Sequence, residues 1–325
     1  MRTHHYFNHS LRLDGAPYAI FKACQRIPGV ESYWYDCHTP VKHVPKADLH
    51  VAVDWAEDAT PFADYLEPHP TVYWISDTHC SEASFQFRLK KARRCDRVYV
   101  SILSDVERFA KEGVKVEWLP YAAEPLCYRP FPATDIPSQP LVGDDHLKES
   151  VERTYDVGFV GYAAHSPDRM EFLDAMFKRF PNHRYSWGKF FEDAAREMAM
   201  AKVVLNQSAV DSTNMRFFEA LSGGNCQLAF ASTDTGMLKA INGVHAFLYR
   251  SLEEAFSLAE WALAHPQQRQ DIEREARKFI LGGHTYLHRA YRLLDMTPPP
   301  EEDMRALILT WPGADTQIPM PVKGL

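Results

Sequence analysis

The sequence of 325 residues lacks the features that define several large classes of protein. No uncharged apolar run approaches the ~18 residues of a membrane-spanning helix, and the opening MRTHHYFNHS has no apolar segment behind its basic residue. We therefore expect no transmembrane segment and no secretory signal. The six cysteines form no C-x-x-C pair and fit no zinc finger or ribbon. These absences favour a cytoplasmic protein whose thiols are reduced.

Basic residues are also fewer than acidic ones. The chain has 36 Lys and Arg residues and 43 Asp and Glu residues, which gives a formal net charge of −7. Nucleic acid is thus a less favoured partner, since neutralising phosphates needs clustered basic charge. The densest basic run, RLKKARRCDR at 88–97, has Phe85, Leu89 and Ala92 at helical spacing. We expect a core-facing helix with a solvated basic face; an anionic acceptor, a membrane surface or nucleic acid are the alternatives.

Histidines are common but scattered. His4, His5 and His9 stand close together near the start of the chain and could chelate a metal. We expect them instead to be solvated residues of the N-terminal segment.

Short apolar segments alternate with amphipathic ones from residue 156 onward, which predicts a parallel sheet covered by helices on both faces. The expected strands are Asp156–Val160, His183–Trp187, Lys202–Leu205, Asn225–Phe230 and His245–Tyr249. The expected helices are Pro167–Phe180, Phe190–Ala199, Met215–Ser222, Gly236–Ala240, Leu252–Ala264 and Gln268–Leu281. Ser166-Pro167 and the capping box that begins at Ser251 mark two of the helix starts.

The first half of the chain shows the same alternation less regularly. The expected strands are His5–Asn8, Leu49–Val53, Thr71–Ile75, Arg97–Ser101 and Lys115–Leu119, and the expected helices are Ala16–Arg26, Ser84–Arg94 and Asp105–Glu112. A chain longer than ~250–300 residues usually splits into two domains. We therefore predict an α/β protein with two Rossmann-like, doubly wound domains facing a central cleft, where ligands of such sheets bind.

The domain boundaries follow from composition. We assign 1–130 to an N-terminal domain, the proline-rich 131–153 to a linker, and 154–284 to a C-terminal domain. Residues 285–325 are expected to form a last helix and a tail that could cross back to the N-terminal domain.

The stretch 202–224, KVVLNQSAVDSTNMRFFEALSGG, carries the most informative pattern. A strand leads into a polar loop with Asp211, and a helix opens near Asn214 with Arg216 and Glu219 on its first turns. A helix N-terminus beside an arginine suits a diphosphate, and a carboxylate can accept from both hydroxyls of a ribose. The alternative for Arg216 and Glu219 is a solvated ion pair three residues apart.

RFFEALSGG, at 216–224, resembles the R-x-F-E-A-x-x-x-G signature of GT-B glycosyltransferases of the CgeB-like spore-maturation branch, which have a glycosyl transferase group 1-like C-terminal domain. Other segments are similar to parts of the same proteins. They are TYDVGFVGY, AKVVLNQS and the H-T-Y-x-x-R element at 284–289 in the second half, and RVYVS with VEWLPYAAEPLCYRP in the first half. The similarity covers about 155–296 and is thin before residue 95.

The resemblance implies transfer of a sugar from a nucleotide-sugar donor that the C-terminal domain binds. Glu219 would hold the ribose, and Arg216 with the helix start at Asn214 would neutralise the leaving diphosphate. Asp211 matches the first acid of the E-x7-E pattern of related retaining enzymes, as Asp rather than Glu, and this favours retention of anomeric configuration.

Two further loops of the C-terminal domain complete the implied donor site. Gly161 and Tyr162 would line the cleft after the first strand. Lys189, in Trp187-Gly188-Lys189, would lie at the edge of the base or the phosphates.

The sequence contains no D-x-D pair for a catalytic metal, and Asp77-Thr78-His79 is the nearest candidate. We expect no metal or other cofactor, since fixed cationic groups and helix amides can stabilise a departing diphosphate. The N-terminal domain would hold the acceptor, and His79 or Asp14 would act as general base if the reaction inverts configuration. The acceptor is open: a saccharide, a protein or a small molecule, less favourably nucleic acid. A nucleotide-sugar epimerase or hydrolase and a non-catalytic scaffold of the same fold are the alternatives.

Overall fold

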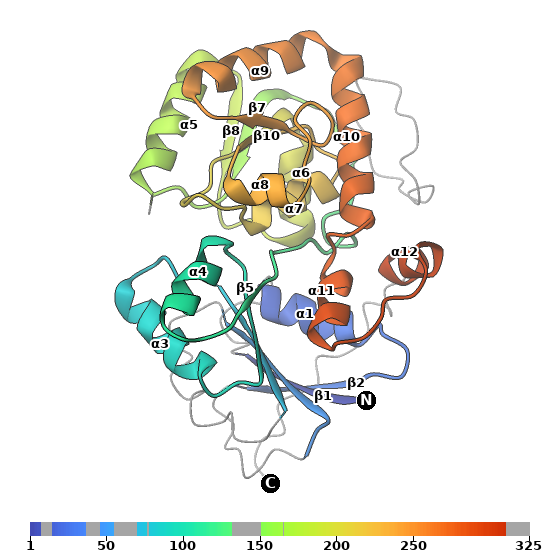
Figure 1. Cartoon of the computed structure of the whole chain (residues 1–325). Coiled ribbons are helices and arrows are strands. Elements are labelled where there is room, and N and C mark those ends of the chain that lie inside the picture. The colour runs from blue at the N-terminus through green and yellow to red at the C-terminus, as the bar shows by residue number, and fades with distance from the viewer. Residues whose placement is uncertain are drawn as a thin grey trace. The chain divides into compact units, whose positions relative to one another are not determined.

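A computed structural model describes residues 1–7, 15–36, 46–54, 70–76, 78–131, 151–164 and 166–309. The chain forms two compact units, each built on its own sheet (Figure 1). The first unit contains Met1–Tyr121 and Tyr286–Leu325, and the second contains Ala122–Thr285. Both sheets are parallel, so the predicted α/β class with two Rossmann-like domains is confirmed.

The first unit has a six-stranded sheet in the order β2-β1-β3-β4-β5-β6. Its strands are β1 (Arg2–Phe7), β2 (Glu31–Asp36), β3 (Leu49–Asp54), β4 (Thr71–Ile75), β5 (Arg97–Val100) and β6 (Glu117–Trp118). Its helices are α1 (Ala16–Cys24), α3 (Glu82–Ala92), α4 (Ser104–Lys111), α11 (Tyr286–Leu293) and α12 (Glu301–Leu309). The C-terminal helices thus belong to the same unit as the N-terminal strands.

The β4 strand, TVYWI, is buried along its whole length because helices cover both faces of the sheet. Tyr73 and Ile75 belong to one apolar cluster with Phe85 of α3 and Phe109 of α4. Trp74 points to the opposite face, where its indole Nε1 donates to the carbonyl of Leu119 at 2.8 Å.

Three expectations for the first unit were wrong. The strand β2 was not predicted. His4 and His5 are not solvated but 1% exposed, because β1 runs from Arg2 between β2 and β3 inside the sheet. On α3 the basic face is only partly solvated, since Arg88 and Lys91 are each 1% exposed and the Lys91 ammonium lies 4.1 Å from the centre of the Phe87 ring. His9 lies outside the described residues.

The second unit has a five-stranded sheet in the order β11-β10-β9-β7-β8. Its strands are β7 (Tyr155–Val160), β8 (His183–Ser186), β9 (Ala201–Asn206), β10 (Gln227–Phe230) and β11 (Phe247–Tyr249). Its helices are α5 (Pro167–Arg179), α6 (Phe191–Ala199), α7 (Met215–Ser222), α8 (Thr233–Met237), α9 (Leu252–Ala264) and α10 (Pro266–Leu281). Only α8 departs clearly from expectation, because it begins at the Ser232 cap rather than at Gly236.

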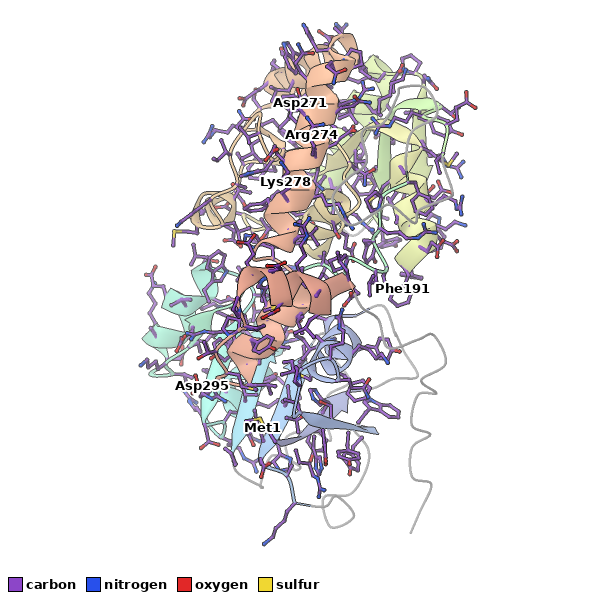
Figure 2. The ribbon with its side chains drawn as sticks, turned by 90° about the vertical axis from the view of Figure 1, so that its right-hand side faces the viewer. Met1, Phe191, Asp271, Arg274, Lys278 and Asp295 are labelled. Atoms are coloured by element: carbon purple, nitrogen blue, oxygen red, sulfur yellow. The ribbon has the colours of Figure 1, made fainter. Side chains whose placement is uncertain are left out.

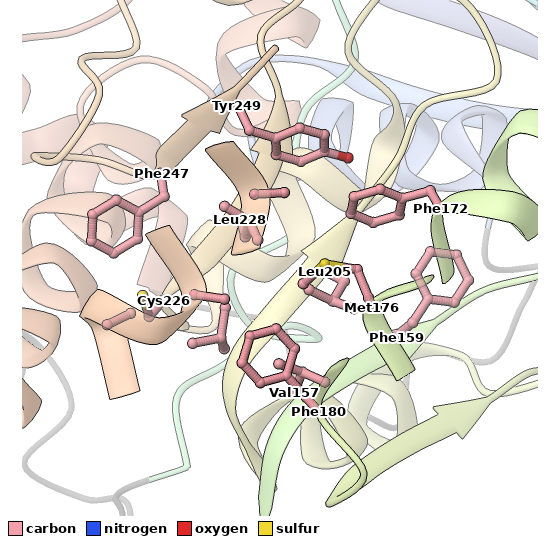
Figure 3. Close-up of a cluster of buried hydrophobic side chains, with 14 of the residues drawn as sticks. Val157, Phe159, Phe172, Met176, Phe180, Leu205, Cys226, Leu228, Phe247 and Tyr249 are labelled. Atoms are coloured by element: carbon pink, nitrogen blue, oxygen red, sulfur yellow. The ribbon is translucent and has the colours of Figure 1, made fainter. Parts of the chain in front are cut away.

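The two faces of this sheet carry separate cores. Side chains of α5 and α9 pack on one face, where the Phe172 ring stacks on Tyr249 with centres 5.0 Å apart (Figure 3). Ala194 and Met198 of α6 and Ala220 of α7 pack on the other face. Gly158 lets β7 and β9 approach closely, because a Cβ there would lie 2.7 Å from the Ala201 Cβ.

The helix α10 borders the second unit with one buried and one charged side. Ile272, Ala276 and Ile280 are buried, while Asp271, Arg274 and Lys278 lie along the outer side (Figure 2). This division is typical of a helix that covers a core.

Residues 122–131 belong to the second unit, where Tyr128 and Phe131 pack against Val160 and α6. Residues 132–150, the greater part of the expected linker, lie outside the described residues. Among the described residues, no helix is both long and apolar enough to span a membrane.

The strand order of the second unit contains a point of reversal. After β7 the chain adds β8 on one side of that strand, and it then crosses to the other side to add β9, β10 and β11 in turn. The order in which strands are added to the sheet thus reverses between β7 and β9. The loops that follow these two strands diverge at that point, and a crevice between such loops is where doubly wound sheets bind ligands.

Candidate functional site

The helix α7 begins directly beyond the carboxyl end of β9. Asn214 caps it, because its Oδ1 accepts from the Phe217 amide at 3.0 Å. The same side chain pairs with Asn206 at the end of β9, donating from Nδ2 at 2.9 Å and accepting at Oδ1 at 3.2 Å. Asn214 therefore has structural partners, and its effect on a ligand would act through the helix that it caps. The amides of Met215 and Arg216 have no hydrogen bond within the described part of the chain.

Arg216 and Glu219 form an ion pair on the first turns of α7, with Nη1 2.9 Å from Oε2. Glu219 is 4% exposed, while Arg216 is only partly buried. Among the described residues, Glu219 Oε1 has no hydrogen-bond partner. The pair therefore holds one carboxylate oxygen and leaves the other able to accept.

Asp211 lies in the β9–α7 loop and is exposed. Its Oδ1 accepts from the amide of Thr233 at 3.1 Å, and its Oδ2 accepts from the Thr233 hydroxyl at 2.9 Å. Thr233 is the first residue of α8. Asp211 thus ties the β9–α7 loop to the start of α8.

Exposed aromatic rings gather after β7 and β8. Tyr162 is 55% exposed and Trp187 is 65% exposed, and their ring centres lie 6.2 Å apart. Lys189 is exposed on the same β8–α6 loop. At Gly161 an added Cβ would lie 3.3 Å from the Phe159 ring, so a larger residue would press against that ring.

The remaining catalytic candidates lie in the first unit. His79 is exposed after β4, and Asp14 and Asp77 lie outside the described residues. Sequence reasoning missed Asp105, at the start of α4, which accepts a short hydrogen bond from the buried Thr78 hydroxyl. Burial raises the pKa of Asp105 above its ordinary value, against the lowering effects of Thr78 and of nearby positive groups. Its only sequence signal is an acid at a helix start.

Sequence reasoning also missed Arg169 on α5, which is 8% exposed and donates to two backbone carbonyls. No group of three or more metal-ligating side chains occurs among the described residues.

Residues 149–295 match the family of glycosyl transferase-like domains. No curated protein matches the chain significantly.

Several solved structures have a similar fold over 91% or more of this chain. HepE from Anabaena, in complex with UDP and glucose, has a TM-score of 0.63 and 14% identity, covering 91% of this chain and 98% of its own. Sucrose-phosphate synthase from Thermosynechococcus elongatus has a TM-score of 0.61 and 10% identity, covering 91% and 98%. BGT of phage T4, in complex with UDP-glucose, has a TM-score of 0.55 and 9% identity, covering 95% and 99%.

The chain therefore has the GT-B fold. The domain match and the shared fold together support a glycosyltransferase.

Proposed function

We propose that this protein transfers a glycosyl group from a uridine diphosphate sugar to an acceptor, and that the second unit holds the donor. The observation that carries the proposal is the start of α7 beyond β9, where the Arg216–Glu219 pair and two unbonded amides lie beside the reversal of strand order. The UDP in the HepE complex and the UDP-glucose in the phage T4 complex support the choice of nucleotide. We further propose the CgeB-like branch, on the resemblance of RFFEALSGG to its signature.

The diphosphate is the part of the donor whose negative charge grows as the sugar leaves. The amides of Met215 and Arg216 and the Arg216 guanidinium offer fixed donors for that charge. The Nη1 of Arg216 is held by Glu219, so the cation is oriented before the ligand arrives. Because fixed donors can carry this charge, we propose a reaction that needs no metal.

The nucleoside has two proposed contacts. Glu219 Oε1 accepts from a ribose hydroxyl, since the other oxygen is already occupied by Arg216. Trp187 and Tyr162 offer a face for the base, because large rings that are exposed to water gain most when a flat ligand covers them. Lys189 adds positive charge to the same edge.

Titration of the purified protein with UDP in a buffer that contains EDTA tests the proposal. Saturation at 100 times the dissociation constant should add about 2.7 kcal/mol to the free energy of unfolding. AMP is the control nucleotide, and it should bind more weakly. Failure of UDP and UDP-glucose to bind with or without Mg²⁺ would overturn the uridine donor.

Turnover separates the enzyme classes that share this fold. A transferase releases UDP from UDP-glucose faster when an acceptor is added. An epimerase changes the sugar while it stays attached to UDP, and a hydrolase releases glucose to water without an acceptor. Binding without any of these reactions indicates a non-catalytic scaffold.

A further inference from the structure

Arg169 spans the two loops that diverge at the reversal of strand order in the second unit. It is the third residue of α5, after the Ser166 cap. Its Nε donates to the carbonyl of Gln207 at 2.7 Å, and its Nη1 donates to the carbonyl of Tyr162 at 2.8 Å. Tyr162 lies in the loop after β7, and Gln207 opens the loop after β9. One guanidinium thus fixes the separation of both loops.

Gln207 is held a second time, through its side chain. The Tyr249 hydroxyl at the end of β11 makes a short hydrogen bond to Gln207 Oε1 and lies 3.4 Å from the carbonyl of Asn206. The Tyr249 ring is itself fixed, because it stacks on Phe172 with the planes 1° apart. The start of the β9–α7 loop is therefore anchored from α5 and from β11.

The charge of Arg169 is uncompensated by acid. Both of its hydrogen-bond acceptors are neutral carbonyls, and no carboxylate of the described residues pairs with it. Burying a cation without a counter-charge costs free energy of folding. An arginine with a purely structural role would therefore be unfavourable at this position. Lysine could not replace it, because only the planar fork of arginine presents donors to two carbonyls at fixed angles.

We propose that Arg169 is a positioning residue for the donor site, which holds the loops after β7 and β9 at the separation that a nucleoside diphosphate requires. The proposal rests on the proposed function for its ligand. Its geometric part, the fixing of the two loops, is independent of any ligand. The positive charge that Arg169 places between the two loops favours the same anionic class of ligand.

Two variants test the proposal. Arg169→Lys keeps a charge but loses the fork, and Tyr249→Phe removes one hydroxyl while it keeps the ring on Phe172. The matched control is Arg289→Lys in the first unit. Arg289 is also buried and also donates to two backbone carbonyls, from Nε to Pro120 at 2.7 Å and from Nη2 to Tyr121 at 2.9 Å.

Hydrogen–deuterium exchange without ligand is the first measurement. The Gly161 amide donates to the carbonyl of Ser186 at the end of β8, at 2.9 Å, and the Ser212 amide donates to the carbonyl of Val210 within its own loop, at 2.7 Å. Their exchange therefore reports whether the start of each loop stays in place. Both variants should speed exchange at 206–213, and Arg169→Lys should also speed it at 161–164. Arg289→Lys should leave these segments unchanged. Unchanged exchange in Arg169→Lys would overturn the positioning role.

The dissociation constant for UDP, measured by calorimetry, is the second measurement. Arg169→Lys should raise it roughly 2- to 30-fold, the range expected for residues that act through others. Faster loop exchange with an unchanged dissociation constant would overturn the functional part of the proposal. If the wild-type protein does not bind UDP, the proposed function fails, while the exchange measurement still decides the fixing of the loops.

Discussion

Nη1 of Arg216 lies 2.9 Å from Oε2 of Glu219, so the two residues assigned to different parts of the donor contact each other before any donor is bound. A pair three residues apart on a helix is often a solvated surface contact. Here the side chain of Glu219 is only 5% exposed, which makes the pair part of the interior of the second unit. The contact orients the guanidinium and also occupies half of the carboxylate.

Removing the Glu219 carboxylate should weaken nucleotide binding. Glu219→Ala should lose about 1.5–3 kcal/mol of UDP affinity, the usual range for hydrogen bonds to a charged group. That loss corresponds to a dissociation constant roughly 10- to 150-fold higher, measured by calorimetry. Asp271→Asn is the control, because Asp271 pairs with Arg274 at the same helical spacing on the outer side of α10. If Glu219→Ala binds UDP as tightly as Asp271→Asn does, Glu219 does not contact the donor.

Chelation should leave turnover intact. The proposed donors for the leaving diphosphate are Arg216 and the start of α7, so exhaustive EDTA treatment should not change the rate of UDP release. Arg216→Ala should lower kcat roughly 10²- to 10³-fold, the effect of removing one donor to a developing anion. Loss of activity in EDTA that Mg²⁺ or Mn²⁺ restores would contradict the metal-independent mechanism.

The proposed retention of configuration rests on Asp211, and the contact of this residue with Thr233 suggests a sharper test than one substitution. If Asp211 acts only through α8, Asp211→Asn and Thr233→Val should lower kcat equally. If it acts at the donor sugar of a retaining enzyme, Asp211→Asn should lower kcat further than Thr233→Val. Proton NMR of the product gives the anomeric configuration directly.

A product of inverted anomeric configuration would assign the catalytic role to a general base of the first unit, His79 or Asp14. His79→Ala or Asp14→Ala should then lose the roughly 10²- to 10⁴-fold that a general base contributes. Under retention both variants should keep most of their turnover.

The α/β class and most elements could be predicted because apolar periodicity and caps are local signals. Met215–Ser222 and Leu252–Ala264 match their predicted bounds, since polar caps precede both apolar patterns. The strand β2, ESYWYD, could not be predicted in this way. Among the described strands it lies at the edge of its sheet and pairs with β1 alone, and its polar start is typical of a loop.

Burial in the first unit was harder to predict because it depends on partners that are distant in sequence. His4 and His5 are polar and near the chain start, yet β1 pairs with strands that begin at Glu31 and Leu49. At the site, Glu219 and Arg216 carry a recognisable pattern. Arg169 carries none, because its partners are backbone carbonyls, which every residue has.

A group of three buried charged side chains should contribute to the free energy of unfolding of the second unit. Glu273 accepts from Arg153 at 2.6 and 2.8 Å and lies 3.7 Å from the Nε of Arg269. All three side chains are at most 10% exposed. Glu273→Gln removes the carboxylate charge that both buried guanidinium groups contact and should cost about 3–5 kcal/mol in a urea titration.

The control for the triad is Glu260→Gln, which breaks a pair with Arg179 whose side chains are 46% and 57% exposed. An exposed pair contributes about 0–1 kcal/mol, so this variant should unfold near the wild-type midpoint. If both substitutions shift the midpoint equally, burial of the triad has no special energetic effect.

Acid should destabilise the first unit before the second, because burial lowers the pKa of three histidines in the first unit and, in the described part of the second, that of one histidine, His245. Burial lowers the pKa of His5 from 6.5 to about 3, and burial with His50 and Arg2 lowers that of His4 to about 4. Burial also lowers the pKa of His288 to about 4, aided by Arg289. An unfolded histidine takes up its proton near pH 6.5.

Between pH 6.5 and 4 the unfolded first unit therefore binds more protons than the folded one. The stability from these histidines is complete above pH 6.5 and falls as the pH drops toward their folded values, by up to about 1.4 kcal/mol per pH unit for each histidine. The raised pKa of Asp105 has the opposite sign, since protonation of that carboxyl relieves its burial. One carboxyl cannot offset three histidines over this window.

Hydrogen–deuterium exchange at pH 7, 6 and 5, corrected for the intrinsic pH dependence of exchange, should show protection lost in β1 and β3 before β7 and β9. His5→Gln keeps a polar group beside the Thr3 hydroxyl, which now lies 3.1 Å from Nε2, but it cannot titrate. This variant should show a shallower decline of first-unit stability with falling pH. Identical slopes for His5→Gln and the wild-type protein would mean that the buried imidazole of His5 is not the group that takes up the proton on unfolding.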